Sequence, residues 1–394
     1  MSNFFFIVLY FAFIGTTINV GASFEYSPLP VLISYLFLTK YIKTLLKTRI
    51  LFSLMIIVHF FCLLFSTTTG SIEPLKEAAF FAILSCGYIY CYRCDYSKTI
   101  SHLLIISIIF LVVAVFEYLS PDFSAAKSIF LTRSVAHSEE FNARGVSSLS
   151  TEPSFFSLTI FSLWLIVYSL LNFNKLPFNY SLIWIVCLVL SKSTMIILII
   201  PLILLTTDFS FLKNNIPLQL SAFFVLIIVI YNTIDNFDSN TFRAIQILIS
   251  LFENLNFEFI NDDSAKARLF YINKDLYLSG ELFLFPSFPG SYELIQSMLD
   301  APNQLSSPEE YSITMSGSLL GRFLVEFGFL IFFFIFYLFY KLLYKFSIFK
   351  LLLVLLIFIC IYLQMISLLF SPISFSLGFA MYKIFNLKFV EKFK

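Results

Sequence analysis

Long apolar runs separated by short polar breaks dominate the chain. A helix needs about 20 apolar residues to cross roughly 30 Å of hydrocarbon, and it satisfies its own backbone hydrogen bonds there. The pattern predicts about twelve such spans, each bounded to within several residues. They are residues 4–20, 28–46, 50–66, 74–92, 101–118, 153–171, 177–190, 194–207, 216–231, 319–340, 348–366 and 370–386.

Two neighbouring spans, 177–190 and 194–207, are short, and only Ser191, Lys192 and Ser193 separate them. The pattern allows two interpretations, a tight helical hairpin or a single broken helix. The number of helices predicted for the chain depends on which one holds.

Composition excludes a soluble domain. Hydrophobic residues make up 59% of the 394 residues and charged residues 12%, and the mean hydropathy is +0.90. The sequence therefore predicts an all-α polytopic membrane protein. The first apolar run lacks the basic region of a signal peptide, so we expect it to stay attached as a spanning helix. The six cysteines lie in apolar runs or at the expected cytoplasmic side, so no disulfide framework is indicated.

The distribution of charge orients the predicted bundle, because cytoplasmic loops are enriched in Lys and Arg. With both termini in the cytoplasm, the cytoplasmic segments hold 15 of the 25 basic residues and only three of the 24 acidic ones, Asp95, Asp208 and Glu391. The opposite orientation would reverse this bias.

These boundaries divide the chain into five parts, of which the two outer loops are long enough to carry chemistry. The larger loop contains an amphipathic pattern over 242–255 and a turn-rich stretch at 285–291 before a second short amphipathic stretch. The parts are a five-helix segment (1–118), a first outer loop (119–152), central helices (153–231), the large outer loop (232–318), and the last helices with the tail (319–394).

Residues 144–156 join an arginine, several hydroxyl residues and a Glu-Pro-Ser turn to the start of an apolar helix. Proline fits the first turn of a helix because its missing N–H has no partner there in any case. The free N–H groups and the dipole of that end attract anions. The stretch, which contains Arg144, Glu152 and Ser154, therefore predicts an anion site at the membrane boundary.

Five arginines fall on the outer side: Arg133, Arg144, Arg243, Arg268 and Arg322. Guanidinium groups bind phosphate in a bidentate manner and keep their charge. Each arginine alone is explained by salt bridges with the outer acids. As a set in two long loops, they favour a site for a lipid-linked pyrophosphate.

Three further side chains are candidates with a plain alternative. Glu152 either stabilises a helix dipole or acts as a general base near the arginines. Arg322 and Glu326 lie four residues apart, so they share a helix face and pair, as a structural ion pair or as an active-site wall. His137 is either a base or an exposed loop residue.

Several signatures are absent: a P-loop, G-x-G-x-x-G after a strand, H-E-x-x-H, and D-x-D in an outer loop. We therefore expect no metal, no cofactor and no nucleic acid partner.

Four segments, in this order, resemble those of the bacterial O-antigen polymerases, in the superfamily that also contains the O-antigen ligases. They are Arg144-Gly145 through Glu152-Pro153-Ser154-Phe155, Leu190-Ser191-Lys192-Ser193-Thr194, Asp263-Ser264-Ala265-Lys266-Ala267-Arg268, and Gly317 to Gly328. A ligase would carry a His-Asn pair where this chain has Gly317 and Ser318, which argues against that relative and leaves the base unidentified.

The resemblance implies a glycosyltransferase C-type fold in the inner membrane of a Gram-negative bacterium. It implies metal-independent transfer of a glycan from undecaprenyl pyrophosphate to a fresh lipid-linked repeat on the periplasmic face. Arg144, Arg243 and Arg268 would neutralise the departing pyrophosphate, and Glu152 would be the acid or base. The implied partners are the undecaprenyl-pyrophosphate-linked oligosaccharide, membrane lipid and a protein that regulates chain length. The main rival is a lipid-linked oligosaccharide flippase or other transporter, which the long outer loop disfavours.

Overall fold

The computed structural model of the chain describes residues 3–15, 27–120, 145–150, 153–193, 196–208, 274–282, 285–298, 319–330 and 370–386. This part of the chain is helical, and it contains no strand. It divides into two compact units, each assembled from separate stretches of sequence. Unit 1 comprises Met1–Pro28 and Cys94–Phe259, and unit 2 comprises Leu29–Arg93 and Ile260–Lys394.

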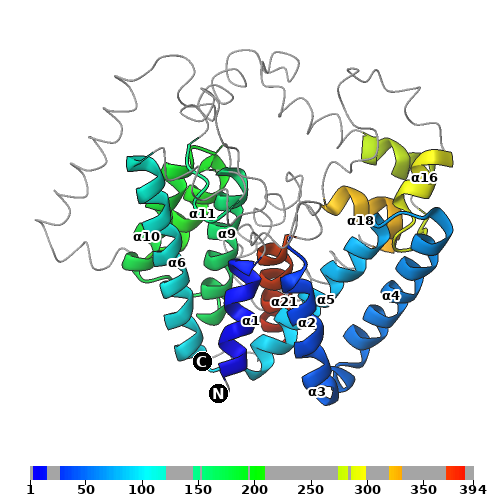
Figure 1. Cartoon of the computed structure of the whole chain (residues 1–394), viewed down its shortest axis with the longest axis horizontal. Helices are drawn as coiled ribbons and strands as arrows, with labels where there is room; N and C mark the ends of the chain where they lie inside the picture. The colour runs from blue at the N-terminus through cyan, green and yellow to red at the C-terminus, as the bar shows by residue number, and fades with distance from the viewer. Residues whose placement is uncertain are drawn as a thin grey trace, which may run out of the picture. The chain divides into compact units, whose positions relative to one another are not determined.

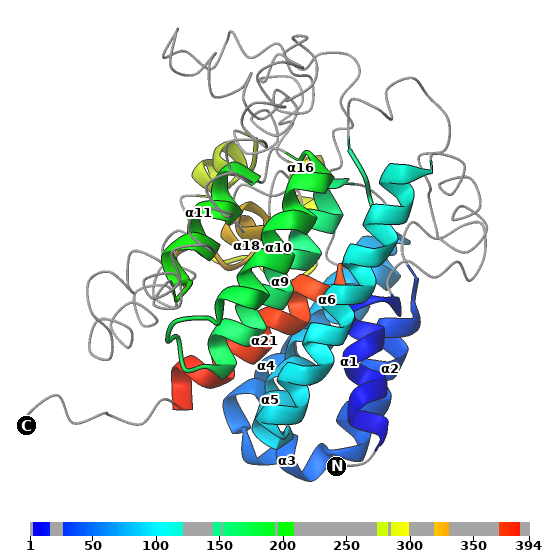
Figure 2. The same ribbon diagram turned by 90° about the vertical axis from the view of Figure 1, so that its left-hand side faces the viewer.

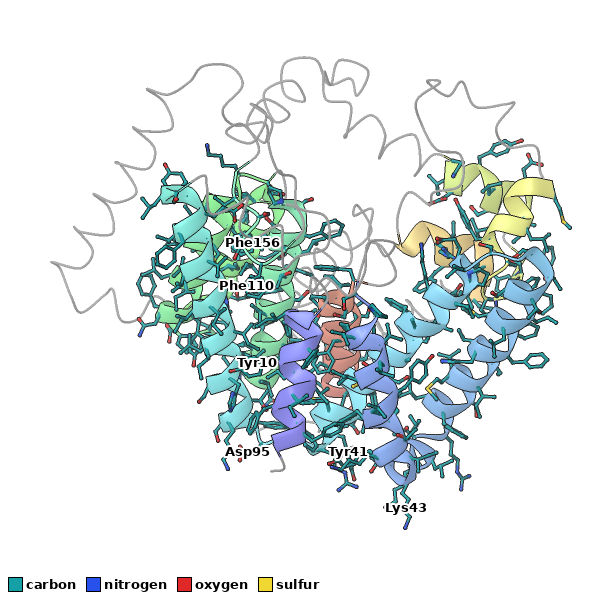
Figure 3. All side chains as sticks on the ribbon, viewed as in Figure 1. Tyr10, Tyr41, Lys43, Asp95, Phe110 and Phe156 are labelled. Carbon is teal, nitrogen blue, oxygen red and sulfur yellow. The ribbon has the colours of Figure 1, made fainter. Side chains whose placement is uncertain are left out.

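In unit 1, α6, α9, α10 and α11 pack side by side, and α1 lies against α6 (Figures 1 and 2). Aromatic side chains fill the contacts, as where the rings of Phe110 and Phe156 stack with centroids 6.0 Å apart (Figure 3). The helices are α1 (Asn3–Phe13), α6 (Tyr96–Leu119), α9 (Pro153–Leu170), α10 (Phe178–Ser191) and α11 (Ile196–Thr206).

In unit 2, α5 is the central helix, and α2, α4 and α21 all pack against it. The two short helices α16 and α18 also contact each other. The helices are α2 (Leu29–Lys40), α3 (Ile42–Lys47), α4 (Arg49–Thr69), α5 (Glu73–Arg93), α16 (Tyr292–Met298), α18 (Leu319–Phe327) and α21 (Ser371–Asn386).

Two glycines let α5 and α21 approach to backbone contact. A Cβ atom at Gly87 would overlap the carbonyl oxygen of Phe375, and a Cβ atom at Gly378 would overlap that of Leu84. Small residues at a helix interface permit such close packing, which membrane helices use because lipid supplies no hydrophobic driving force between them.

Three described helices are long and apolar enough to cross a membrane: Leu51–Thr69, Tyr96–Leu119 and Pro153–Leu170. They match three of the predicted spans, and shorter apolar helices occupy Phe4–Phe13, Leu29–Lys40 and Phe178–Ser191. The predicted spans 216–231 and 348–366 lie outside the residues that the structure describes, as do the amphipathic pattern 242–255 and residues 331–340 of the tenth span.

Within the predicted span 28–46 the helix is interrupted, because α2 ends at Lys40 and α3 begins at Ile42. Tyr41 between them has φ −109° and ψ 27°, which is not helical. The basic residues that follow explain the break, since an ammonium group is stabilised where it can reach water. Figure 3 shows the Lys43 side chain pointing away from the helices of its unit.

The structure resolves the alternatives for residues 177–207 in favour of a hairpin. Lys192 ends α10 in the left-handed conformation with φ 47°, so the chain turns back before α11. The open ends of the two helices meet, since Leu176 donates its N–H to the carbonyl of Thr206 (2.8 Å) and accepts the N–H of Asp208 (2.8 Å).

Candidate functional site

A buried group of charges in unit 2 surrounds Arg322. Its Nε lies 3.3 Å from Glu326 Oε1, one turn along α18, and its Nη2 lies 3.8 Å from Glu77 Oε2 of α5. Both glutamates are fully buried, and Arg322 is 7% exposed. The pairing of Arg322 with Glu326 that their spacing predicted is confirmed, and Glu77 joins them from a distant part of the sequence.

Glu77 also binds the turn of residues 285–291. Its Oε2 accepts the N–H of Gly290 at 2.8 Å. Ser287, in the same turn of residues 285–291, donates its hydroxyl to the backbone carbonyls of Val325 (3.0 Å) and Glu326 (3.2 Å). The 285–291 turn is thus fastened to α5 by a carboxyl group and to α18 by a serine.

Tyr292, the first residue of α16, adds an aromatic ring to the group. Arg322 Cζ lies 5.5 Å and Lys274 Nζ 5.7 Å from the centre of that ring, within cation–π range. The tyrosine hydroxyl donates to Asp275 Oδ1 at 2.5 Å. Burial lowers the pKa of Lys274 to about 8, while the neighbouring Asp275 acts in the opposite direction.

Three polar atoms of this group have no hydrogen-bond partner among the described residues: Glu77 Oε1, Glu326 Oε2 and Arg322 Nη2. A buried polar atom without a partner is costly. One guanidinium also cannot neutralise two carboxylates. The group therefore has capacity for one more proton or positive charge.

A second polar site lies in unit 1, where residues 145–150 fold back on α6. The carboxylate of Glu117, buried on α6, accepts the N–H of Ser147 (3.3 Å), the hydroxyl of Ser147 (3.2 Å) and the N–H of Ser148 (2.7 Å). The Ser148 hydroxyl donates to the carbonyl of Phe110 at 2.6 Å. The N–H groups of this loop thus hold an anion that the chain itself supplies.

Gly145 brings this loop against the turn after α10. Its φ is +78°, and a Cβ atom there would overlap the carbonyl of Ser191. The next residue, Val146, donates its N–H to the carbonyl of Leu190 at 3.1 Å. Ser157 of α9 and Ser191 share a hydroxyl hydrogen bond of 2.8 Å. Two of the segments that carry the family resemblance therefore pack on each other.

The predicted site residues fall into two groups. Arg322 and Glu326 are buried together in unit 2, and Ser154 is half-buried in the first turn of α9. Since two carboxyl groups already surround Arg322, its role with pyrophosphate stays a prediction. The others lie outside the described residues, and their proximity stays a prediction too: Arg133, His137, Arg144, Glu152, Arg243 and Arg268.

The sequence interpretation missed Glu77, Glu117, Lys274, Asp275 and Tyr292. Glu77 and Glu117 did carry a signal, because each is an acid within or at the end of a predicted span, and such residues are costly and mark specific interactions. Lys274 and Asp275 are ordinary loop residues by sequence, and only the fold reveals that they are buried.

Within the described ranges, no group of three or more His, Cys, Asp or Glu side chains is arranged to hold a metal ion. No family model, no curated protein and no solved structure matches the chain.

Proposed function

We propose that the protein is an O-antigen polymerase. It would join undecaprenyl-pyrophosphate-linked oligosaccharide repeats on the periplasmic face of the inner membrane, by metal-independent glycosyl transfer. The observation that carries the proposal is the contact between the Gly145 loop and the Leu190–Ser193 turn. These are two of the segments that resemble the polymerases, they lie over 40 residues apart, and they meet through a glycine that admits no side chain.

The chemistry needs positive charge at the departing pyrophosphate. Arg144 directly precedes Gly145 in the sequence, and Lys192 follows the carbonyl that Gly145 contacts. Lys192 therefore lies at this end of the unit 1 bundle, and Arg144, the neighbour of Gly145 in the sequence, would supply a second cation. Arg268 and Arg243, in the large outer loop, would complete the site around the diphosphate, and Glu152 would act on the acceptor hydroxyl.

The proposal predicts that Arg144→Ala and Arg268→Ala each abolish polymer while the protein still inserts, because each removes a bidentate phosphate ligand. The measurement is the lipopolysaccharide ladder of a strain that lacks the chromosomal gene and carries the variant. Loss of polymer leaves glycan with single repeats. The matched control is Lys98→Ala, which removes an exposed cation at the start of α6 that pairs with Asp95.

A normal ladder in both arginine variants would refute the site. A deletion strain with no repeat at all on its surface would favour a flippase instead, and one with polymer that is made but not attached would favour a ligase. Purified protein with the lipid-linked repeat should form polymer in the presence of EDTA, which tests metal independence directly.

A further inference from the structure

Within unit 2, three helices hold the 285–291 turn of the large outer loop. Glu77 of α5 accepts the N–H of Gly290, Ser287 donates to two carbonyls of α18, and the ring of Phe288 stacks on Phe61 of α4 at 4.6 Å. Of these contacts, the one made by Glu77 uses an ionisable side chain, and this side chain is fully buried. Its protonation state therefore bears on how the loop is held.

The surroundings of Glu77 favour the neutral acid. A carboxylate only accepts hydrogen bonds, whereas a protonated carboxyl also donates one. Among the described residues, Glu77 Oε1 and Glu326 Oε2 are both buried without a partner, and both carboxyl groups face the guanidinium of Arg322. A single proton held by the two carboxyl groups gives one of them a hydrogen bond to donate. It leaves one negative charge for the one guanidinium of Arg322.

The other charged and titratable groups near Glu77 act on Arg322 more weakly than Glu326 and Glu77 do, or pair with one another. Glu73 and Lys76 on α5 form an ion pair with each other. Tyr292 donates to Asp275, and Lys274 lies over the same ring. The group from α4 is the thiol of Cys62, buried beneath Gly290.

We propose that Glu77 is a positioning residue. It holds the 285–291 turn as the neutral partner of a carboxyl pair with Glu326, and this pair together carries the single negative charge that Arg322 requires. Gly290 donates to one carboxyl oxygen of Glu77, and the shared proton occupies the other.

Cys62 reports on this contact without any engineered label. Its Sγ would lie 3.3 Å from a Cβ atom at Gly290 and it has no exposed surface, so the turn covers it. Cys94 is partly exposed and Cys86 is buried in the helix core. The intact protein is alkylated with a small maleimide, and the reaction of each cysteine is quantified by mass spectrometry. Cys94 is the standard for a reactive thiol and Cys86 the standard for a protected one.

In the wild type, Cys62 should react far more slowly than Cys94. Glu77→Ala should raise the Cys62 rate by about tenfold, since loss of one buried hydrogen bond shifts the opening of the turn by that order. Glu77→Gln should react like the wild type, because its amide accepts from Gly290 and donates to Glu326. The control Glu73→Gln, one turn earlier on α5, should change the Cys62 rate much less than Glu77→Ala, because Glu73 pairs with Lys76 and acts on Arg322 more weakly than Glu77 does.

The charge balance is tested by a pair of variants. Glu77→Gln and Glu326→Gln should each keep Cys62 covered, because one carboxylate remains for Arg322. The double variant should expose it, because a buried guanidinium without a counter-charge is strongly unfavourable. A purely additive pair would contradict the proposal. So would rapid labelling of Cys62 in Glu77→Gln, which would show that a second negative charge holds the turn.

Glu77→Ala also has a consequence that rests on the proposed function. If Arg243 and Arg268 of the large outer loop bind the pyrophosphate, releasing the 285–291 turn by Glu77→Ala should shorten the polymer ladder. Glu77→Gln, which keeps the turn in place, should leave the ladder as in the wild type. The labelling result does not depend on polymer synthesis. Uncovered Cys62 with a normal ladder would refute only the link to the proposed function, and covered Cys62 in Glu77→Ala would refute the positioning role.

Discussion

The two buried polar sites accommodate carboxyl groups in opposite ways. In unit 1, Glu117 accepts three hydrogen bonds from Ser147 and Ser148, so backbone N–H groups and a hydroxyl satisfy its charge. In unit 2, Glu77 and Glu326 share one arginine, and each keeps an oxygen without a partner among the described residues. The stability of the unit 1 site therefore depends on backbone geometry. The stability of the unit 2 site depends on how many charges and protons its side chains carry.

The same substitution should therefore have unequal effects in the two sites. Glu117→Gln should lower the free energy of unfolding by about 2–3 kcal/mol, because both carboxylate oxygens accept and the amide offers only one acceptor. Glu77→Gln should cost less than about 1 kcal/mol, since in the proposed carboxyl pair Glu77 donates one hydrogen bond and accepts another, as an amide can. Thermal unfolding of the purified protein in detergent measures both. Equal losses would remove the distinction between the sites.

The dependence of the unit 1 site on backbone geometry can be separated from glycine's conformational freedom. Gly145→Ala should cost roughly 1–3 kcal/mol beyond the effect of its positive φ, because the new Cβ overlaps the Ser191 carbonyl. Gly70 is the matched control, because it has φ +68° and no atom within 4 Å of the position of a Cβ. Gly70→Ala thus measures conformational strain alone. If both variants unfold at the same temperature, the loop does not depend on this close approach.

Lys274 tests the role of charge in unit 2. Its pKa is lowered from 10.5 to about 8 by burial, so the penalty of burying the ammonium is present below pH 8 and is relieved as the pH rises towards 10.5. Lys274→Met should remove this penalty and stabilise the protein near pH 7 by roughly 1–2 kcal/mol, after loss of the contact with Tyr292. The advantage should disappear by about pH 10.5. Unfolding curves of the wild type and of Lys274→Met between pH 7 and about pH 10.5 measure this difference in stability. A difference that grows as the pH rises would contradict the prediction.

Local patterns predicted what depends on neighbours in sequence. The length of apolar runs predicted the three described helices that are long enough to cross a membrane, and a spacing of four residues predicted the Arg322–Glu326 pair. The break at Tyr41 was not predicted, because apolar residues continue on both sides of it. Its signal in the sequence is the pair Lys40 and Lys43, whose ammonium groups are stabilised where they reach water.

Long-range contacts were not predictable in this way. Glu77 and Gly290 are 213 residues apart, and no periodicity links them. Glu117 likewise binds a loop 30 residues away through backbone N–H groups, which every residue type except proline offers. The acids themselves were conspicuous in apolar surroundings, but their partners follow from the fold.

The contact of Gly87 and Gly378 with backbone carbonyls has a consequence for synthesis. α5 is made early, yet the surface around Gly87 is completed only by α21, almost 300 residues later. During translation, the exposed backbone around Gly87 is therefore in contact with lipid or with a chaperone until α21 is made. The packing of α5 in unit 2 is therefore completed only after α21 has been synthesised. Any side chain larger than a hydrogen atom at Gly87 or Gly378 would prevent this close packing.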